Sequence, residues 1–493
     1  MGRAEGMRDV EVDAPADVPP GAPEPGPDVA RRRRRLLRWW PVALVLVAVV
    51  VGSQVLHDAR ARARVAAARG HPEVVGYDVG PALPVSAADP DLVWNEPGAV
   101  VEGVRVGSAS TDSGQPRAVE GVDVSSGAVV WRSPVESPEE AAALRSVQPP
   151  WCTVGDPAGD AVTCFVQDAP TQEVGDDSWQ LGAPVRSRLL TVDARTGEVT
   201  AERELAPVAT AFVVEDVLVR AELVEDVVRV AAEDPATGDE RWSVDLPVVT
   251  GALEIGGSPS PSLQVTERHV VAGLGGHAWS LRRSDGSVEV TSGQVWVGRG
   301  ERLVSSSDRG RTSHLHGADG RFDVATAGEP VTFGLDDGSV PALDLLVDTS
   351  EEGRRVRAVD AATGETAWEY PVRGAAYGSV LLLHDVLYGA DAEDVWAVDA
   401  RDGREVWRSP RHPGGEPGPT QLGTWLQPLT DGRALLLAEP TGSDGTEGVL
   451  RAWSLTSGDA QWSTTLPPEA GGYVTVRDGV LYGGLPDPVR LGG

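Results

Sequence analysis

Four copies of the pattern Asp-x3-Gly-x3-Trp recur along this chain of 493 residues. With 58 glycines and 15 tryptophans in the sequence, chance would give roughly 0.3 copies, so the pattern marks an internal repeat. A fifth unit keeps the spacing with serine in place of aspartate. The five units are Asp123/Gly127/Trp131, Asp234/Gly238/Trp242, Asp360/Gly364/Trp368, Asp399/Gly403/Trp407 and Ser454/Gly458/Trp462.

The physical chemistry of one unit predicts a tight turn between two strands. Asp360 ends one strand and accepts hydrogen bonds from the backbone of its own turn, and Gly364 supplies the positive φ that closes the turn. Trp368 then lies on the second strand, where a large ring packs between sheets. A second hairpin usually precedes the motif, as in residues 380–389, so each repeat has about four short strands. This is the pattern of a β-propeller blade.

Weaker copies fill the gaps between the five units. Asp193 and Gly197 keep the turn, with Ala201 where tryptophan belongs, and Gly286 keeps it with Val290. The long interval between Gly286 and Gly364 suggests a degenerate blade around Gly320, which we leave out of the count. The seven turns counted are those of Gly127, Gly197, Gly238, Gly286, Gly364, Gly403 and Gly458.

Remnants at the two ends of the repeat region complement each other. Strand-like residues 472–491 follow the last turn, and 84–94 precede the first one. A propeller must satisfy its terminal strand edges, so we expect one blade to be built from both ends. The fold class predicted is all-β, a propeller of about eight four-stranded blades.

Units of the form Ala-x-Asp-x-x-Thr-Gly-x-x-x-Trp, with a strand such as residues 476–484, resemble the repeats of the PQQ-like β-propeller superfamily. The resemblance covers residues 81–493. That family includes quinoprotein alcohol dehydrogenases, the BamB lipoprotein of outer-membrane assembly, and propeller ectodomains of bacterial membrane proteins. Its dehydrogenases carry a vicinal disulfide over the cofactor. The cysteines of this chain, Cys152 and Cys164, are not adjacent, so we expect no cofactor.

The N-terminal segment predicts a membrane anchor. Residues 1–38 form a Pro- and acid-rich tail, expected to be disordered, that ends in an arginine cluster. Residues 39–56 are an apolar run just long enough to span a bilayer as an uncleaved signal-anchor. The arginine bias places the N-terminus in the cytoplasm. Residues 57–80 are a linker, and 81–493 are the propeller outside the membrane.

Cys152 and Cys164 flank a strong turn sequence. Folding this hairpin symmetrically places the two side chains opposite each other, within reach of a disulfide. The alternative is a pair of buried free thiols. A disulfide agrees with an exported domain.

Composition excludes several function classes. The formal net charge of -31 argues against nucleic-acid binding, and the absence of lysine excludes a P-loop, a Schiff base and a Ser-Lys dyad. His314 and His316 share a strand face, which leaves open either a metal pair or solvated side chains. We find no catalytic, cofactor or metal constellation. The function expected is a binding or scaffold module of the cell envelope with a protein or glycan partner. The alternatives are a ligand-sensing ectodomain and a PQQ-dependent oxidoreductase.

Overall fold

The computed structural model describes residues 27–87, 99–109, 117–124, 128–135, 150–154, 160–168, 171–175, 178–181, 184–207, 210–214, 217–235, 237–248, 261–306, 312–316, 323–348, 354–373, 379–412, 426–441, 447–484 and 488–492. The chain forms two compact units, Met1–Arg64 and Val65–Gly493. Every described strand lies in the second unit.

The first unit contains most of one long helix, α1 (Pro27–Ala68). The helix includes the expected span of residues 39–56 and extends beyond it at both ends, because arginine, leucine and alanine all favour helix. Residues 27–38, expected as part of a disordered tail, are therefore helical, while residues 1–26 lie outside the described part. Among the described residues we find no helix that is both long and apolar enough to cross a membrane.

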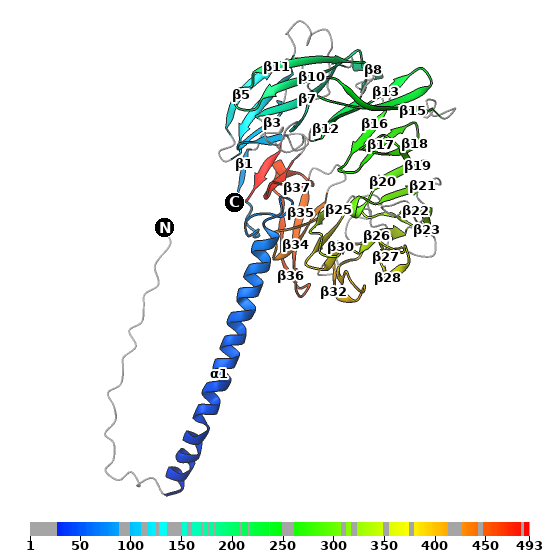
Figure 1. Cartoon of the computed structure of the whole chain (residues 1–493). Coiled ribbons are helices and arrows are strands. Elements are labelled where there is room, and N and C mark those ends of the chain that lie inside the picture. The colour runs from blue at the N-terminus through cyan, green and yellow to red at the C-terminus, as the bar shows by residue number, and fades with distance from the viewer. Residues whose placement is uncertain are drawn as a thin grey trace, which may run out of the picture. The chain divides into compact units, whose positions relative to one another are not determined.

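The second unit is an all-β propeller. Within the described residues, nine sheets of four or five strands follow one another around a ring, as the colours of Figure 1 show from cyan through green and yellow to red. Nearly all neighbouring strands are antiparallel. We number the sheets as blades 1 to 9.

The first four blades comprise β2 (Ala99–Val101), β3 (Val104–Ala109), β4 (Ala118–Asp123) and β5 (Val129–Pro134) in blade 1; β6 (Trp151–Val154), β7 (Ala161–Asp168), β10 (Arg186–Asp193) and β11 (Val199–Leu205) in blade 2; β12 (Thr210–Val214), β13 (Val217–Val224), β14 (Val227–Glu233) and β15 (Glu240–Pro247) in blade 3; and β16 (Ser262–Val265), β17 (His269–Leu274), β18 (His277–Arg282) and β19 (Val288–Ser292) in blade 4. An extra hairpin, β8 (Thr171–Gly175) and β9 (Ser178–Leu181), is inserted in blade 2 between β7 and β10.

The remaining blades comprise β20 (Gln294–Val297), β21 (Leu303–Ser306), β22 (Thr312–His316) and β23 (Asp323–Ala327) in blade 5; β24 (Glu329–Pro330), β26 (Leu343–Asp348), β27 (Arg355–Asp360) and β28 (Thr366–Pro371) in blade 6; β25 (Phe333–Asp336), β29 (Val380–Leu383), β30 (Val386–Ala390), β31 (Asp394–Asp399) and β32 (Glu405–Pro410) in blade 7; β33 (Pro428–Thr430), β34 (Ala434–Pro440), β35 (Gly448–Ser454) and β36 (Ala460–Thr465) in blade 8; and β37 (Val474–Arg477), β38 (Val480–Gly483), β39 (Val489–Leu491) and β1 (Val85–Ala87) in blade 9. Two 3-10 turns are η2 (Arg299–Glu301) and η3 (Pro468–Ala470).

The count of about eight blades is wrong by one, because blade 5 is complete. Its four strands occupy the long interval around Gly320 that we left out of the count. The turn itself, residues 317–322, lies outside the described part. Val324, four residues after Gly320, stands where the other repeats have tryptophan, so the strongest signal of the motif was missing.

The expected closure of the ring by both ends is confirmed. Strand β1 pairs antiparallel with β39, so that Val85 lies opposite Leu491 and Ala87 opposite Val489. Three strands of blade 9 thus come from the end of the chain and the fourth from the start of the propeller. The other N-terminal remnant, residues 92–94, lies outside the described residues.

The hydrophobic core is a series of clusters between neighbouring blades. One cluster joins blades 6 and 7 and includes Trp368, Leu382 and Trp396. Another joins blades 7 and 8 and includes Trp407 and Trp453. Because each blade buries its faces against two neighbours, stability depends on the seams between blades.

Candidate functional site

The aspartate of the repeat is held by its own turn. Asp360 Oδ1 accepts hydrogen bonds from the backbone N–H groups of Ala362 and Thr363, each at 2.9 Å. The Thr363 hydroxyl donates to the same oxygen at 3.1 Å. These bonds favour the ionised form, and they hold the pKa of Asp360 below its ordinary value. The Asp360 carboxylate is therefore occupied in closing the turn.

The same arrangement recurs in the other repeats. Asp193 accepts from the Thr196 hydroxyl at 2.8 Å, from the Thr196 N–H at 2.8 Å and from the Arg195 N–H at 3.0 Å, and these bonds, the hydroxyl bond most strongly, lower its pKa. Asp234 accepts from the N–H of Thr237 at 2.9 Å. Asp399 accepts from the N–H of Arg401 at 3.0 Å. Asp123 ends β4 in the equivalent place, and Gly127 lies outside the described residues.

The repeat tryptophan reaches the turn of the next blade. Trp368 Nε1 donates to the Ala400 carbonyl of blade 7 at 3.0 Å. A Cβ added to Gly403 would lie only 2.7 Å from the Trp368 ring, so the glycine is needed for this close approach and for its φ of +70°. Three further seams have the same geometry: Trp131 with Ala194 and Gly197, Trp242 with Arg283 and Gly286, and Trp407 with Leu455 and Gly458.

Two seams use other side chains where the repeat lacks its tryptophan. In blade 2, Arg203 Nη1 lies 2.5 Å from the place of a Cβ on Gly238, and Arg203 also pairs with Glu233 at 2.9 Å. In blade 5, Val324 fills the equivalent place against Gly364. Arg203 lies two residues beyond the expected position of the tryptophan, so the spacing of the repeat could not reveal it.

Trp462 ends the series of repeat tryptophans. It is half-buried and packs against a cluster that includes Ala470, Leu481 and Leu491. These residues belong to blade 9 and to the turn that leads into it. The tryptophan of blade 8 therefore joins the last complete repeat to the blade that closes the ring.

The predicted disulfide between Cys152 and Cys164 is confirmed. The two residues lie directly opposite each other in the pairing of β6 with β7. Their exposed fractions are 6% and 0%, within a cluster between blades 1 and 2 that includes Val119 and Val162. The bond therefore ties the inner hairpin of blade 2 at a buried position.

A buried ion network that the sequence did not reveal joins blades 1 and 2. Asp168, at the end of β7, bonds to the Arg117 guanidinium and lies 3.7 Å from that of Arg188. Arg117 also donates to the Gln167 carbonyl at 2.7 Å, and Arg188 to the Val135 carbonyl at 3.0 Å. These groups are engaged with one another and with backbone carbonyls, which indicates a structural link between blades.

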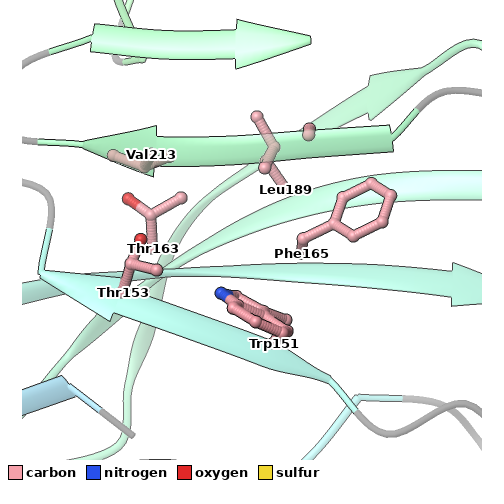
Figure 2. Close-up of a pocket in the computed structure, with 7 residues that line it drawn as sticks. Trp151, Thr153, Thr163, Phe165, Leu189 and Val213 are labelled. Atoms are coloured by element: carbon pink, nitrogen blue, oxygen red, sulfur yellow. The ribbon is translucent and has the colours of Figure 1, made fainter. Parts of the chain in front are cut away.

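A small pocket lies at the seam between blades 2 and 3. Figure 2 shows Trp151, Thr153, Thr163 and Phe165 on neighbouring strands of blade 2, facing Val213 of blade 3. Trp151 packs edge-to-face against Phe212, with ring centroids 5.0 Å apart. The enclosed space has no room for a water molecule. The pocket is therefore an imperfectly packed seam and offers no space for a substrate.

In the described part of the chain, no group of three or more histidine, cysteine, aspartate or glutamate side chains is placed to hold a metal ion. The two histidines singled out by the sequence lie on β22 of blade 5. His316 Nε2 lies 2.8 Å from the Ser305 hydroxyl.

The fold and its seams together define a nine-bladed β-propeller. The described residues of its repeat form the turns and the packing between blades.

Comparison with known proteins identifies the type of repeat. Residues 323–478 match the family model described as outer membrane protein assembly factor BamB, so these blades are PQQ-like propeller repeats. The serine/threonine-protein kinase AfsK of Streptomyces coelicolor is 29% identical over 147 residues, which cover 29% of this chain and 15% of that protein. The chain thus matches a small part of this relative.

Solved structures that match this chain include two quinohemoprotein alcohol dehydrogenases. The enzyme from Comamonas testosteroni has 13% identity and a TM-score of 0.39, covering 83% of this chain and 76% of its own. The enzyme from Pseudomonas putida HK5 has 13% identity and a TM-score of 0.37, covering 87% and 81%. A structure of a eukaryotic initiation factor has 12% identity and a TM-score of 0.42, covering 75% and 90%.

Proposed function

We propose that the protein is a single-pass membrane protein of the cell envelope, whose β-propeller lies outside the cytoplasm and binds an envelope protein or glycan. The observation that carries this proposal is the disulfide between Cys152 and Cys164. Disulfides form and persist in oxidising compartments and are rare in the cytoplasm. The apolar run of residues 39–56, with the arginine cluster before it, supplies the anchor and its orientation.

A binding role has two supports. The described turn aspartates and seam tryptophans make their bonds within the scaffold, as Trp368 does with Ala400. In rigid folds of this kind, the residues that bind a partner usually lie on the connecting loops. The match of residues 323–478 to the BamB family, described as an assembly factor, supports a protein partner.

Ligand sensing by the propeller is the second candidate. The observation in its favour is the similarity to a serine/threonine-protein kinase. Residues 1–38 contain no kinase motif, so we propose that such a sensor would signal through a partner protein. PQQ-dependent oxidation has less support, because the family's dehydrogenases use a vicinal disulfide and this chain has only two, separated, cysteines.

Thiol labelling in intact spheroplasts tests the topology. Both cysteines of the chain are bonded to each other, so a single introduced cysteine is the reactive thiol. Glu393, whose side chain is 64% exposed, is a suitable position on the propeller. A membrane-impermeant maleimide should label Glu393→Cys in intact spheroplasts. The matched variant Val10→Cys in the tail should react only after lysis, and the reverse pattern contradicts the proposed orientation.

Binding is tested by cross-linking in the same cells. A photoreactive amino acid at position 393 should give a defined adduct with an envelope component, while one at the buried position Leu382 should give none. If exposed positions around the ring yield no adduct, the scaffold role is refuted.

A further inference from the structure

The last turn of α1 and the chain that joins it to β1 are built into the propeller unit. We call residues 65–84 the strap. Ala68, Val74 and Val75 of the strap are fully buried, and Val79 is 8% exposed. The first two belong to the core cluster between blades 7 and 8, and the other two to the cluster of blades 8 and 9. Residues 57–80, expected as a linker, thus include part of the core.

Backbone hydrogen bonds fasten the strap to two blades. The N–H of Val75 donates to the Thr430 carbonyl at 2.9 Å, and that of Gly76 to the Gly479 carbonyl at 2.7 Å. In return, the Gly479 N–H donates to the Pro72 carbonyl at 2.9 Å. Such bonds between distant segments are typical of a folded core and not of a flexible linker.

Side chains add to this attachment. The Tyr77 hydroxyl donates to the Leu491 carbonyl and accepts from the Leu481 N–H at 3.2 Å, and burial raises the pKa of Tyr77. Asp431 accepts from the Val79 N–H at 3.0 Å. Both residues tie the strap to positions that are more than 350 residues away in sequence. They hold it beside the blade that closes the ring.

All of these contacts lie at one end of the ring. In blade 7, the turn between β29 and β30 and the turn between β31 and β32 lie together, since the Ala400 N–H donates to the Asp385 carbonyl at 2.7 Å. We call this end the turn rim. Asp431 and Gly479 are in the corresponding first turns of blades 8 and 9. The opposite end, the loop rim, contains Glu393 and the connection that carries β8 and β9.

We propose that the strap fixes the orientation of the propeller at the membrane, with the turn rim toward the bilayer and the loop rim presented to the partner. This inference rests on the proposed anchoring by residues 39–56. Only residues 57–64 separate that span from the strap, and eight residues reach at most about 29 Å. Because the chain enters the ring at the turn rim and is held there, the loop rim faces away from the bilayer.

Hydrogen–deuterium exchange of the full-length protein in detergent micelles tests the strap. Peptides covering residues 71–83 should exchange as slowly as core strands such as β34. Tyr77→Phe removes the hydroxyl that bonds to Leu481 and Leu491, and it should accelerate exchange in the strap. Tyr482→Phe, which alters a half-buried tyrosine on β38, is the matched control and should leave strap exchange unchanged. Strap exchange that is complete at the earliest time point overturns the proposal.

Energy transfer to labelled lipid tests the orientation. Asp402 on the turn rim and Glu393 on the loop rim belong to the same blade and have side chains 61% and 64% exposed. Single cysteine variants of full-length protein, labelled with a donor and reconstituted in vesicles, should differ in distance to the bilayer by about 20 Å, the length of one strand. Asp402→Cys should show the stronger transfer.

The outcomes separate this inference from the proposed function. Equal transfer from the two positions, or stronger transfer from Glu393→Cys, overturns the orientation while leaving the anchoring intact. Failure of the protein to insert into vesicles refutes the anchoring, and the orientation with it. In that case slow exchange in residues 71–83 still shows the strap as part of the ring.

Discussion

Two buried tryptophans in one core cluster provide a sharp test of the seam. Trp407 and Trp453 are 7% and 1% exposed and both lie between blades 7 and 8. Trp407 Nε1 donates to the Leu455 carbonyl at 2.9 Å. Trp453 Nε1 has no hydrogen-bond acceptor among the described residues. The two side chains therefore bury similar rings, but only one of them forms a bond to the next turn.

Replacement of each tryptophan by phenylalanine separates the contribution of the hydrogen bond from that of the buried aromatic side chain. Trp407→Phe leaves the buried Leu455 carbonyl without its donor, which costs roughly 1–3 kcal/mol in addition to the cavity. Trp453→Phe creates a similar cavity but removes an unsatisfied donor, whose burial is itself unfavourable by roughly 1–3 kcal/mol. The free energies of unfolding of the two variants should therefore differ by about 2–6 kcal/mol, with Trp407→Phe the less stable.

Thermal unfolding of the purified full-length variants measures this difference. For a propeller of roughly 400 residues, 1 kcal/mol shifts the Tm by about 1 °C, so the two Tm values should differ by about 2–6 °C. Equal decreases in Tm for both variants would show that the volume of the buried side chain alone determines the stability of the seam. A lower Tm for Trp453→Phe would refute the reasoning.

Three further predictions concern the disulfide, the turns and the closing blade. Replacing Cys152 and Cys164 by serine should destabilise the propeller by about 3 kcal/mol; unreduced, denatured wild type should resist thiol alkylation, and two free thiols there would contradict the bond. The lowered pKa of Asp360 means that its turn stabilises the fold above the ordinary aspartate pKa and loses this effect as pH falls; Asp360→Asn should flatten the dependence of Tm on pH between about 2 and 5, and an unchanged profile would contradict it. Deletion of residues 472–493 removes three of the four strands of blade 9 and should destabilise the whole ring; a monomeric product with wild-type Tm would refute closure by both ends.

The turn and the position of the tryptophan could be predicted from the sequence because their interactions are local. Asp360 bonds to groups two and three residues away, and Gly364 is required by its own backbone angle. The pairing of Cys152 with Cys164 follows from a short hairpin. In each case the partner lies within about a dozen positions, so spacing and residue type carry the information.

The seams, the blade number and the strap were decided by tertiary structure. Arg203 and Val324 replace the tryptophan through contacts with the next blade, and the Arg117–Asp168 pair joins residues on different blades. Val75 and Thr430 meet although 355 positions separate them (430 − 75). No periodicity encodes such contacts, because they depend on how the ring closes. The local units of this protein are therefore determined by sequence, while their number and the entry of the chain into the ring are determined by packing between blades.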